Sequence, residues 1–302
     1  MKKIIVGIMG VTILLVFIET YLRYYWGFCD AVLTQESDKF EYIAQPDQNR
    51  FRFRKHVRYN EYSMRSGSLK SSDSIRILGF GDSVLNGGVQ TEQDSLATEI
   101  AQYAINQHII KGGGVIRCLN ISYGSWAPDN CFAYMKEYGD FNANLIFLVV
   151  SSHDAYDNMN FQKVVDIHPS YPSGQYLSAI YELIDRYLIP RIFTKKKEES
   201  DHIVKGNIFN SGFLSFYHYT QENDIPFFIY LHPDKKEMQE RKYDYQGDEI
   251  IKFCESNNIS LLKGIEYEDE SCYRDGIHLN EHGQRILAKI LLHKIKVLLN
   301  LL

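Results

Sequence analysis

Five short apolar runs between residues 75 and 262 constrain the fold of this chain more than any other feature. Each run is four to seven residues long. Near-continuous apolar runs of this length are typical of parallel strands that helices cover on both faces. The pattern therefore predicts an α/β fold, a three-layer sandwich around a central parallel sheet. The expected strands are Ile75–Phe80, Val115–Ile121, Leu145–Val150, Ile225–Leu231 and Ile259–Leu262.

Helical patterns lie between and after these runs, so the chain is expected to form repeated βαβ units. The stretch 155–205 breaks this alternation, because it holds three prolines, an amphipathic segment (YLSAIYELIDRYLI) and a charged run (KKKEES). We interpret it as an insert over the carboxyl edge of the sheet, where α/β proteins bind ligands. The expected helices are Ser95–Ile110, Pro128–Tyr138, Asn210–Asn223, Lys236–Ser256 and Glu281–Leu302.

The first 28 residues differ from the rest of the chain. Lys2 and Lys3 precede an uncharged run, Ile4–Ile18, and an aromatic cluster that ends at Phe28 follows this run. As a helix the run spans ~22 Å of a ~30 Å hydrocarbon core, and lysine snorkelling and the aromatic side chains make up the difference. The segment therefore predicts one transmembrane anchor. A cleaved secretory signal has the same order of residues, but no small-x-small cleavage site follows the run.

Under both interpretations the two lysines stay in the cytoplasm, and the chain from about residue 30 onward is exported. The exported domain is then anchored at the membrane, facing the periplasm or the cell surface, or it is secreted if the segment is cleaved. The 33 basic and 38 acidic residues give a net charge of −5 and a pI near 6.1. These values exclude a nucleic-acid binder held by general basic charge.

The remainder of the chain divides into two parts. Residues 29–73 form a polar lead-in, within which the basic patch Arg50–Lys55 is expected to be a solvated face. Residues 74–302 are expected to form one domain that carries the insert at about 155–205.

A serine stands at the end of the first expected strand, in the sequence Gly79-Phe80-Gly81-Asp82-Ser83. The glycines around it fit neither a dinucleotide loop, nor a phosphate-binding P-loop, nor the G-x-S-x-G hydrolase elbow, and we expect no cofactor. Backbone N–H groups at the start of a following helix favour negative charge beside the serine. Ser83 is therefore a candidate nucleophile, although an Asp-Ser pair is also an ordinary helix cap.

The candidate partners of Ser83 lie far along the chain, just before the last expected helix. A serine hydroxyl needs an imidazole that takes its proton, and the imidazole needs a carboxylate that fixes its tautomer. Asp275 and His278 are three residues apart, so one turn can present both side chains to one pocket. The same pair also suits a surface turn that caps the helix.

Two further positions are candidate donors to an oxyanion. Gly124 follows the second expected strand, and His153 and Asp154 follow the third. The carboxyl ends of parallel strands meet at one edge of the sheet, so we expect these residues to converge with Ser83.

The order of these motifs resembles that of the SGNH/GDSL hydrolases. The resemblance extends over about residues 74–295. It consists of Gly-Asp-Ser83 on the first strand, Gly124 after the second, a polar residue after the third and Asp275-x-x-His278 near the end. The resemblance implies the flavodoxin-like SGNH hydrolase fold. It also implies that Ser83 is the nucleophile, that Asp275 and His278 complete a catalytic triad, and that the N–H groups of Ser83 and Gly124 form an oxyanion hole.

One block departs from the family. Where the family has Gly-x-Asn-Asp, this chain has Ser151-Ser152-His153-Asp154, so His153 stands in place of the asparagine that donates to the oxyanion. A neutral histidine can donate one N–H, so we place His153 in the expected oxyanion hole. The stretch Tyr59–Arg65 (YNEYSMR) also looks like the lead-in of membrane-anchored, exported members.

The resemblance implies a serine esterase that hydrolyses acyl esters, with O-acetyl groups on cell-envelope glycans as the expected substrate. Two alternatives stay open: an acyltransferase that moves an acetyl group onto an envelope polysaccharide, and a non-catalytic glycan-binding protein of the same fold. The insert contributes Tyr156, Tyr171 and Tyr176, which either pack internally or line a sugar-binding cleft.

Metal binding and disulfide formation are the remaining questions that the sequence raises. The scattered histidines lack the spacing of metal ligands, and we expect no metal. Cys254 and Cys272 could pair in an oxidising compartment. The histidines in question are His168, His202, His218 and His232.

Overall fold

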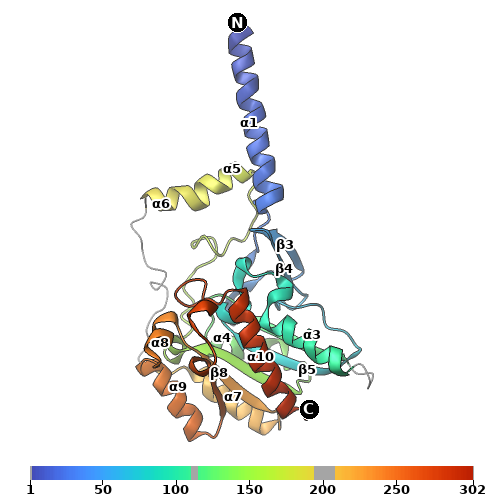
Figure 1. The fold of residues 1–302 in the computed structure, drawn as a ribbon, viewed down its shortest axis with the longest axis vertical. Coiled ribbons are helices and arrows are strands. Elements are labelled where there is room, and N and C mark those ends of the chain that lie inside the picture. The colour runs from blue at the N-terminus through green and yellow to red at the C-terminus, as the bar shows by residue number, and fades with distance from the viewer. Residues whose placement is uncertain (1, 110–114, 194–207, 302) are drawn as a thin grey trace.

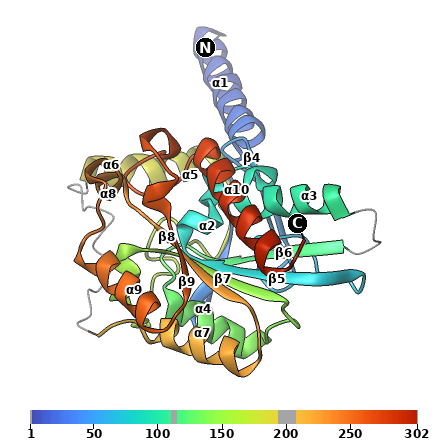
Figure 2. The same cartoon turned by 60° about the horizontal axis from the view of Figure 1, so that its bottom comes forward.

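The structure is a computed structural model that describes residues 2–109, 115–193 and 208–301. Its centre is a five-stranded parallel sheet in the order β6-β5-β7-β8-β9 (Figure 2). This order places the first strand second and is that of flavodoxin-like folds. The predicted α/β sandwich is confirmed, and each expected strand is present. The strands are β5 (Asp73–Gly81), β6 (Val115–Ser122), β7 (Leu145–Ser151), β8 (Phe227–His232) and β9 (Ser260–Lys263).

Helices cover both faces of the sheet, because each strand directs apolar side chains to both sides (Figure 2). All seven residues of the central strand β7 are buried. One apolar core lies between the sheet and α4, α7 and α9, and the other lies between the sheet and α2, α3, α8 and α10. These helices are α2 (Ser83–Asn86), α3 (Ala97–Ile109), α4 (Pro128–Tyr138), α7 (Ser211–Glu222), α8 (Lys235–Glu240), α9 (Tyr245–Ser256) and α10 (Glu281–Leu298).

The helix expected over Lys236–Ser256 is in fact two helices, so this prediction was wrong. The backbone of Arg241 has a φ of 52°, in the left-handed region, and it ends α8. The carboxylate of Asp244 then accepts the N–H groups of Gln246 and Gly247 and begins α9. A short polar side chain that accepts backbone N–H groups favours the start of a helix over its interior. The apolar residues keep a helical spacing on both sides of this start, so the apolar pattern does not reveal the break between the two helices.

The polar lead-in folds into two β-hairpins that pack against the first core. Their strands are β1 (Thr34–Ser37), β2 (Glu41–Ala44), β3 (Gln48–Arg52) and β4 (Lys55–Tyr59). The expectation of a solvated basic face is wrong for Arg52, whose side chain is only 2% exposed and pairs with the buried Glu182 of the insert. This partner lies 130 residues away, beyond the reach of any local pattern.

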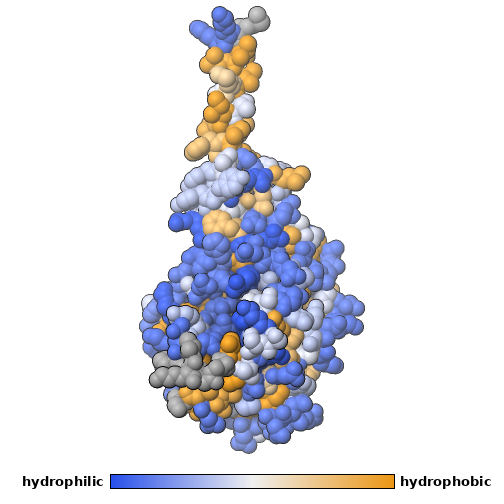
Figure 3. All heavy atoms as spheres, turned by 90° about the vertical axis from the view of Figure 1, so that its right-hand side faces the viewer, coloured by the Kyte–Doolittle hydropathy of each residue, from blue (hydrophilic) through white to orange (hydrophobic). Residues whose placement is uncertain are grey.

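The N-terminal helix α1 (Lys2–Trp26) projects from the body of the molecule (Figure 1). It is the one helix among the described residues that is long and apolar enough to cross a membrane. Its large apolar side chains from Ile4 to Phe17 are exposed, and they form the apolar shaft in Figure 3. Packing begins only near its C-terminal end, where Leu22 is buried against Phe28 and Ala179.

The five cysteines are free thiols. Cys254 belongs to the core on one face of the sheet and Cys272 to the core on the other. The sheet separates the two sulfur atoms, so the pairing left open by the sequence does not form.

Candidate active site

Ser83 is the first residue of α2, directly after strand β5. The carboxylate of Asp82 accepts the N–H of Val84 at 2.8 Å and begins this short helix. Gly87, with a φ of 72°, ends it one turn later. Aspartate at the N-cap is what the sequence Asp-Ser predicts, and the cap here fixes the serine at the carboxyl end of the strand.

His278 and Asp275 lie next to Ser83 in the structure. The hydroxyl of Ser83 lies 2.9 Å from Nε2 of His278, and Nδ1 of the same ring lies 2.9 Å from Oδ2 of Asp275. A carboxylate only accepts hydrogen bonds, so Nδ1 carries the hydrogen and Nε2 is left as an acceptor for the serine. This arrangement can remove the proton of Ser83 and deliver it to a leaving group.

The turn before α10 holds Asp275 in its ionised form. Its Oδ1 accepts the N–H groups of Ile277 at 3.1 Å and His278 at 2.8 Å. Burial alone would raise the pKa of Asp275, but these two donors and the neighbouring imidazole more than offset burial, and the pKa lies below its usual value of 3.8. The carboxylate is therefore charged wherever His278 can act as a base.

A buried pair behind this turn supports it, and the sequence did not reveal its role. His232, fully buried at the end of β8, lies 2.9 Å from Glu268 through Nδ1 and 2.7 Å from the carbonyl oxygen of Ile277 through Nε2. Because both ring nitrogens face acceptors, both donate. Burial lowers the pKa of His232, but the charge of Glu268 and the hydrogen bonds to Glu268 and Ile277 together more than offset burial, and the pKa lies above 6.5. His232 is a positioning residue for the Asp275–His278 turn.

A cavity of about 630 Å³ opens beside Ser83. Ser83, His278, Gly124 and His153 all lie in its wall, while Asp275 lies behind His278 and does not line the cavity. The lead-in and the insert supply much of the remaining wall, including Tyr42, Arg52, Phe53, Tyr59, Tyr171, Arg186 and Tyr187.

Of the three insert tyrosines, Tyr171 lines this cavity. Tyr156 packs against the rings of Phe209 and Tyr245, and the hydroxyl of Tyr176 donates to Asp185. The cavity-lining role is therefore limited to one of the three.

Gly124 lies close to the side chain of Tyr171. A Cβ atom at this position would lie 2.9 Å from the hydroxyl oxygen of Tyr171. Within the described part of the chain, the backbone N–H groups of Ser83 and Gly124 have no protein acceptor. Two N–H groups in the wall of the cavity beside a serine are the kind of donors that stabilise a developing oxyanion.

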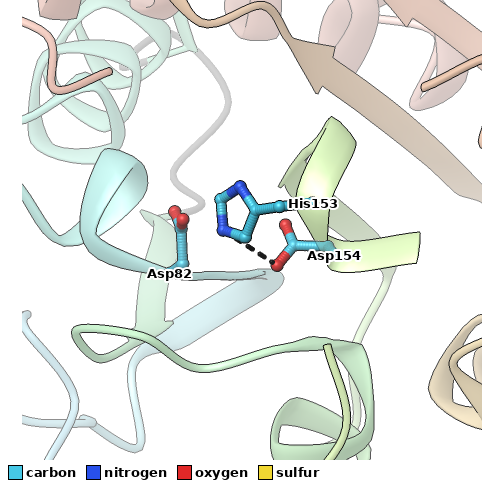
Figure 4. Close-up of side chains that lie close together, drawn as sticks. All are labelled: Asp82, His153 and Asp154. Atoms are coloured by element: carbon cyan, nitrogen blue, oxygen red, sulfur yellow. Dashed lines mark ion pairs between the residues drawn. The ribbon is translucent and has the colours of Figure 1, made fainter. Parts of the chain in front are cut away.

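His153 lies between two acidic side chains, Asp82 and Asp154 (Figure 4). Its Nε2 is 3.6 Å from Oδ1 of Asp154, an ion-pair distance rather than a hydrogen bond. Burial, together with the charge of Asp82, raises the pKa of Asp154 well above its usual value.

The same three side chains, Asp82, His153 and Asp154, are the one set among the described residues close enough to hold a metal ion. Their ligand atoms lie within 4.8 Å of one another. This set was not foreseen, because its members come from two strands rather than from a local spacing. One oxygen of Asp82 is already engaged by Val84 and one of Asp154 by Ser151, which leaves each carboxyl one further oxygen.

Asp157 provides a pH-dependent test of the pocket. Burial and the neighbouring Asp154 raise its pKa from 3.8 to about 7. The folded chain keeps this proton while the unfolded chain releases it, so stability is full below about pH 4 and falls as the pH rises to about 7. Asp157→Asn has no carboxyl group to ionise and so does not lose this stability as the pH rises. We expect the free energy of unfolding of the variant minus that of the native chain to be about 2–3 kcal/mol larger at pH 8 than at pH 5.

Denaturant titrations at the two pH values measure this change. Asp166→Asn is the matched control, because hydrogen bonds from Ser173 lower the pKa of Asp166, so its loss does not stabilise the chain at pH 8. A gain for Asp157→Asn that is equal at both pH values would contradict the assignment.

No family model and no curated protein match this chain. Solved structures similar to it include the lipase/acylhydrolase from Enterococcus faecalis, with 13% identity, a TM-score of 0.43 and coverage of 74% of this chain and 95% of that chain. A carbohydrate acetylesterase family member from Sinorhizobium meliloti has 12% identity, a TM-score of 0.39 and coverage of 75% and 99%. A member of the lipolytic G-D-S-L family from Veillonella parvula has 11% identity, a TM-score of 0.38 and coverage of 73% and 97%. These proteins are of the kind that the sequence motifs resemble, while the chemistry assigned to this chain rests on the distances between Ser83, His278 and Asp275.

Proposed function

We propose that this chain is a serine esterase that cleaves acyl esters through an acyl-enzyme on Ser83. The observation that carries the proposal is the hydrogen-bonded series Ser83–His278–Asp275, whose serine and imidazole lie in the wall of a 630 Å³ cavity. A serine that contacts only the N-terminus of a helix would be a cap. A serine aligned with an imidazole that is itself held by a carboxylate is a nucleophile.

In the proposed reaction, Nε2 of His278 takes the proton of Ser83 as Oγ attacks the ester carbonyl. The N–H groups of Ser83 and Gly124, together with His153, stabilise the negative charge on the carbonyl oxygen. The imidazolium then protonates the departing alcohol, and the acyl group stays on Ser83. Water attacks the acyl-enzyme by the same route, which releases the acid and restores the serine.

The proposed substrates are O-acetyl esters on cell-envelope glycans. The half-buried side chains of Tyr171 and Tyr187 line the cavity and offer flat apolar faces of the kind that sugar rings stack on. One of the similar structures is that of a carbohydrate acetylesterase family member. In this proposal α1 is an uncleaved anchor that keeps the domain at the outer face of the membrane.

A fluorophosphonate probe tests the proposal on the full-length chain. We expect covalent labelling at Ser83, located by peptide mass spectrometry, and hydrolysis of p-nitrophenyl acetate by the unlabelled enzyme. Labelling fails in the proposed scheme if His278 is replaced by alanine, since the serine then lacks its base. An unlabelled Ser83 in the folded native chain would favour a binding protein without catalytic function.

The products separate hydrolysis from transfer. With an acetyl ester and an acetyl-free polysaccharide present together, a hydrolase releases acetate in an amount equal to the ester consumed. Acetyl groups recovered on the polysaccharide instead would identify an acyltransferase that uses the same three residues.

A further inference from the structure

The described part of the insert ends in one helical segment whose two faces differ sharply. It consists of α5 (Ala179–Glu182), a π-helical stretch (Leu183–Leu188) and α6 (Ile189–Phe193). We call residues 179–193 the surface helix. In Figure 1 it runs across the axis of α1, close to the point where α1 enters the body.

We infer that the surface helix lies on the membrane, with its outer apolar face in the interface between headgroups and acyl chains. This inference rests on the proposed anchoring by α1. The outer face of the surface helix takes no part in the proposed reaction.

Side chains of α1 hold the N-terminus of the surface helix in place. The carboxylate of Glu19 accepts the N–H groups of Ala179 at 2.8 Å and Ile180 at 3.0 Å, and it also accepts the hydroxyl of Ser178 at 3.0 Å. The guanidinium of Arg23 donates to the carbonyl oxygen of Leu177. The first N–H groups of a helix need such acceptors, so the direction of the surface helix is set by α1.

The inner face of the surface helix packs against the body. Glu182 is fully buried, binds the guanidinium of Arg52 and accepts the N–H of Cys29. The ring of Tyr187 contacts those of Phe28 and Phe53. These partners lie on the body side of the surface helix, so its opposite face points away from the body of the molecule.

That outer face is a continuous apolar stripe. Its members are spaced by three or four residues, the repeat of one helix face. The stripe consists of Tyr181 (58% exposed), Ile184 (42%), Leu188 (41%) and Ile192 (72%), and Leu177 (95%) lies just before the helix. The ring of Tyr176 contacts that of Tyr181.

The height of this stripe along α1 matches the edge of a bilayer. Glu19, which fixes the surface helix, directly follows the apolar run Ile4–Ile18. That run spans ~22 Å, less than a hydrocarbon core of ~30 Å. A helix that lies in the interface places its apolar face ~5–10 Å into the headgroup and acyl boundary. The surface helix therefore adds apolar contact with the membrane at the level where the apolar run of α1 ends.

Lipid is the occupant that the structure favours over a second protein. An α1 that spans the bilayer brings every copy of the chain to the membrane at this height, and the stripe then faces lipid without any further partner. Tyr21, Tyr24 and Tyr25 lie on α1 just beyond Glu19, and aromatic residues of this kind are enriched at the membrane interface.

Depth-dependent fluorescence quenching of the full-length chain tests the inference. The protein is reconstituted in vesicles of phosphatidylcholine and phosphatidylglycerol (3:1) that contain lipids with a doxyl group at carbon 5 or carbon 12. Single cysteines at Ile184→Cys or Leu188→Cys carry an NBD label, in a background with Cys29→Ser because the other four native thiols are buried. Fluorophosphonate labelling of each variant checks its fold.

Two reporters provide the reference values. Leu14→Cys on the shaft of α1 reports anchoring, and Lys236→Cys on the exposed face of α8 reports a position in water. We expect NBD at positions 184 and 188 to be quenched at least twofold more by 5-doxyl than by 12-doxyl lipid. Position 14 should be quenched by the deeper group, and position 236 by neither.

The outcomes distinguish this inference from the anchoring on which it rests. If position 14 is quenched while positions 184 and 188 behave like position 236, anchoring stands and the membrane contact of the surface helix is wrong. If position 14 is not quenched either, anchoring itself fails and the inference fails with it. Self-quenching between labels at position 188 that grows with protein density, without lipid quenching, would show that a second copy covers the stripe and would also overturn the inference.

Discussion

Replacing Ser83 with alanine is expected to lower kcat/KM for a small acetyl ester by about 10⁴-fold or more. The alanine variant keeps the cavity, Gly124 and the imidazole of His278 but lacks the atom that forms the acyl-enzyme. Rates of p-nitrophenyl acetate hydrolysis by the full-length chain measure the loss. The double variant Ser83→Ala/His278→Ala should lose little more, because the two residues act as one unit.

The matched control for this substitution is Ser170→Ala. Ser170 also lines the cavity, but it lies on the insert, and Nδ1 of His168 accepts its backbone N–H. Its loss should leave kcat within about twofold of the native value. Hydrolysis by Ser83→Ala at the native rate would remove Ser83 from the reaction, whatever its contact with His278.

Replacing Glu182 with glutamine is expected to lower the free energy of unfolding by about 3–5 kcal/mol. Glu182 and Arg52 are 0% and 2% exposed, and the substitution leaves the guanidinium charged and buried without its counter-ion. Burial lowers the pKa of Arg52, but the carboxylate of Glu182 and the hydroxyl of Tyr187 together more than offset burial, so the guanidinium stays charged in the native chain. Guanidinium chloride titrations in detergent micelles measure the change.

Removing both charges separates the ionic effect from simple loss of packing. Arg52→Met/Glu182→Met keeps similar volumes and removes the buried guanidinium of Arg52, although Arg186 also loses its ion pair with Glu182. The double variant should therefore recover much of the stability that Glu182→Gln loses. Glu249→Gln breaks the exposed ion pair with Lys252 and should have no measurable effect. Equal losses in Glu182→Gln and in the double methionine variant would show that the ion pair as such does not matter.

The sequence predicted the sheet and the location of the site for related physical reasons. Strands covered on both faces need unbroken apolar runs, and the five runs are visible in any single sequence. The polar residues that follow three of them, Ser83, Gly124 and His153, had to meet at one edge because parallel strands share their direction. The structure places all three in one cavity wall with His278.

The parts that could not be predicted depend on contacts between distant segments. Arg52 and Glu182 are 130 residues apart, and His232 and Glu268 are 36 apart, so neither pair leaves a local pattern. A lone arginine in a polar stretch is usually solvated, and burial of this one follows from its partner. The break between α8 and α9 was missed because the apolar period continues through the capping residue Asp244.

Because α1 holds the surface helix in place, the N-terminal segment also influences the shape of the cavity. Glu19 holds the first N–H groups of the helix whose Arg186 and Tyr187 line the cavity. Arg52, beside them in the same wall, donates to the carbonyl oxygen of Gly27. A chain cut after residue 28 would lose these supports together. α1 thus supports the wall of the cavity from outside, and mutation or proteolysis of this segment would change the shape of the cavity together with the proposed membrane anchoring.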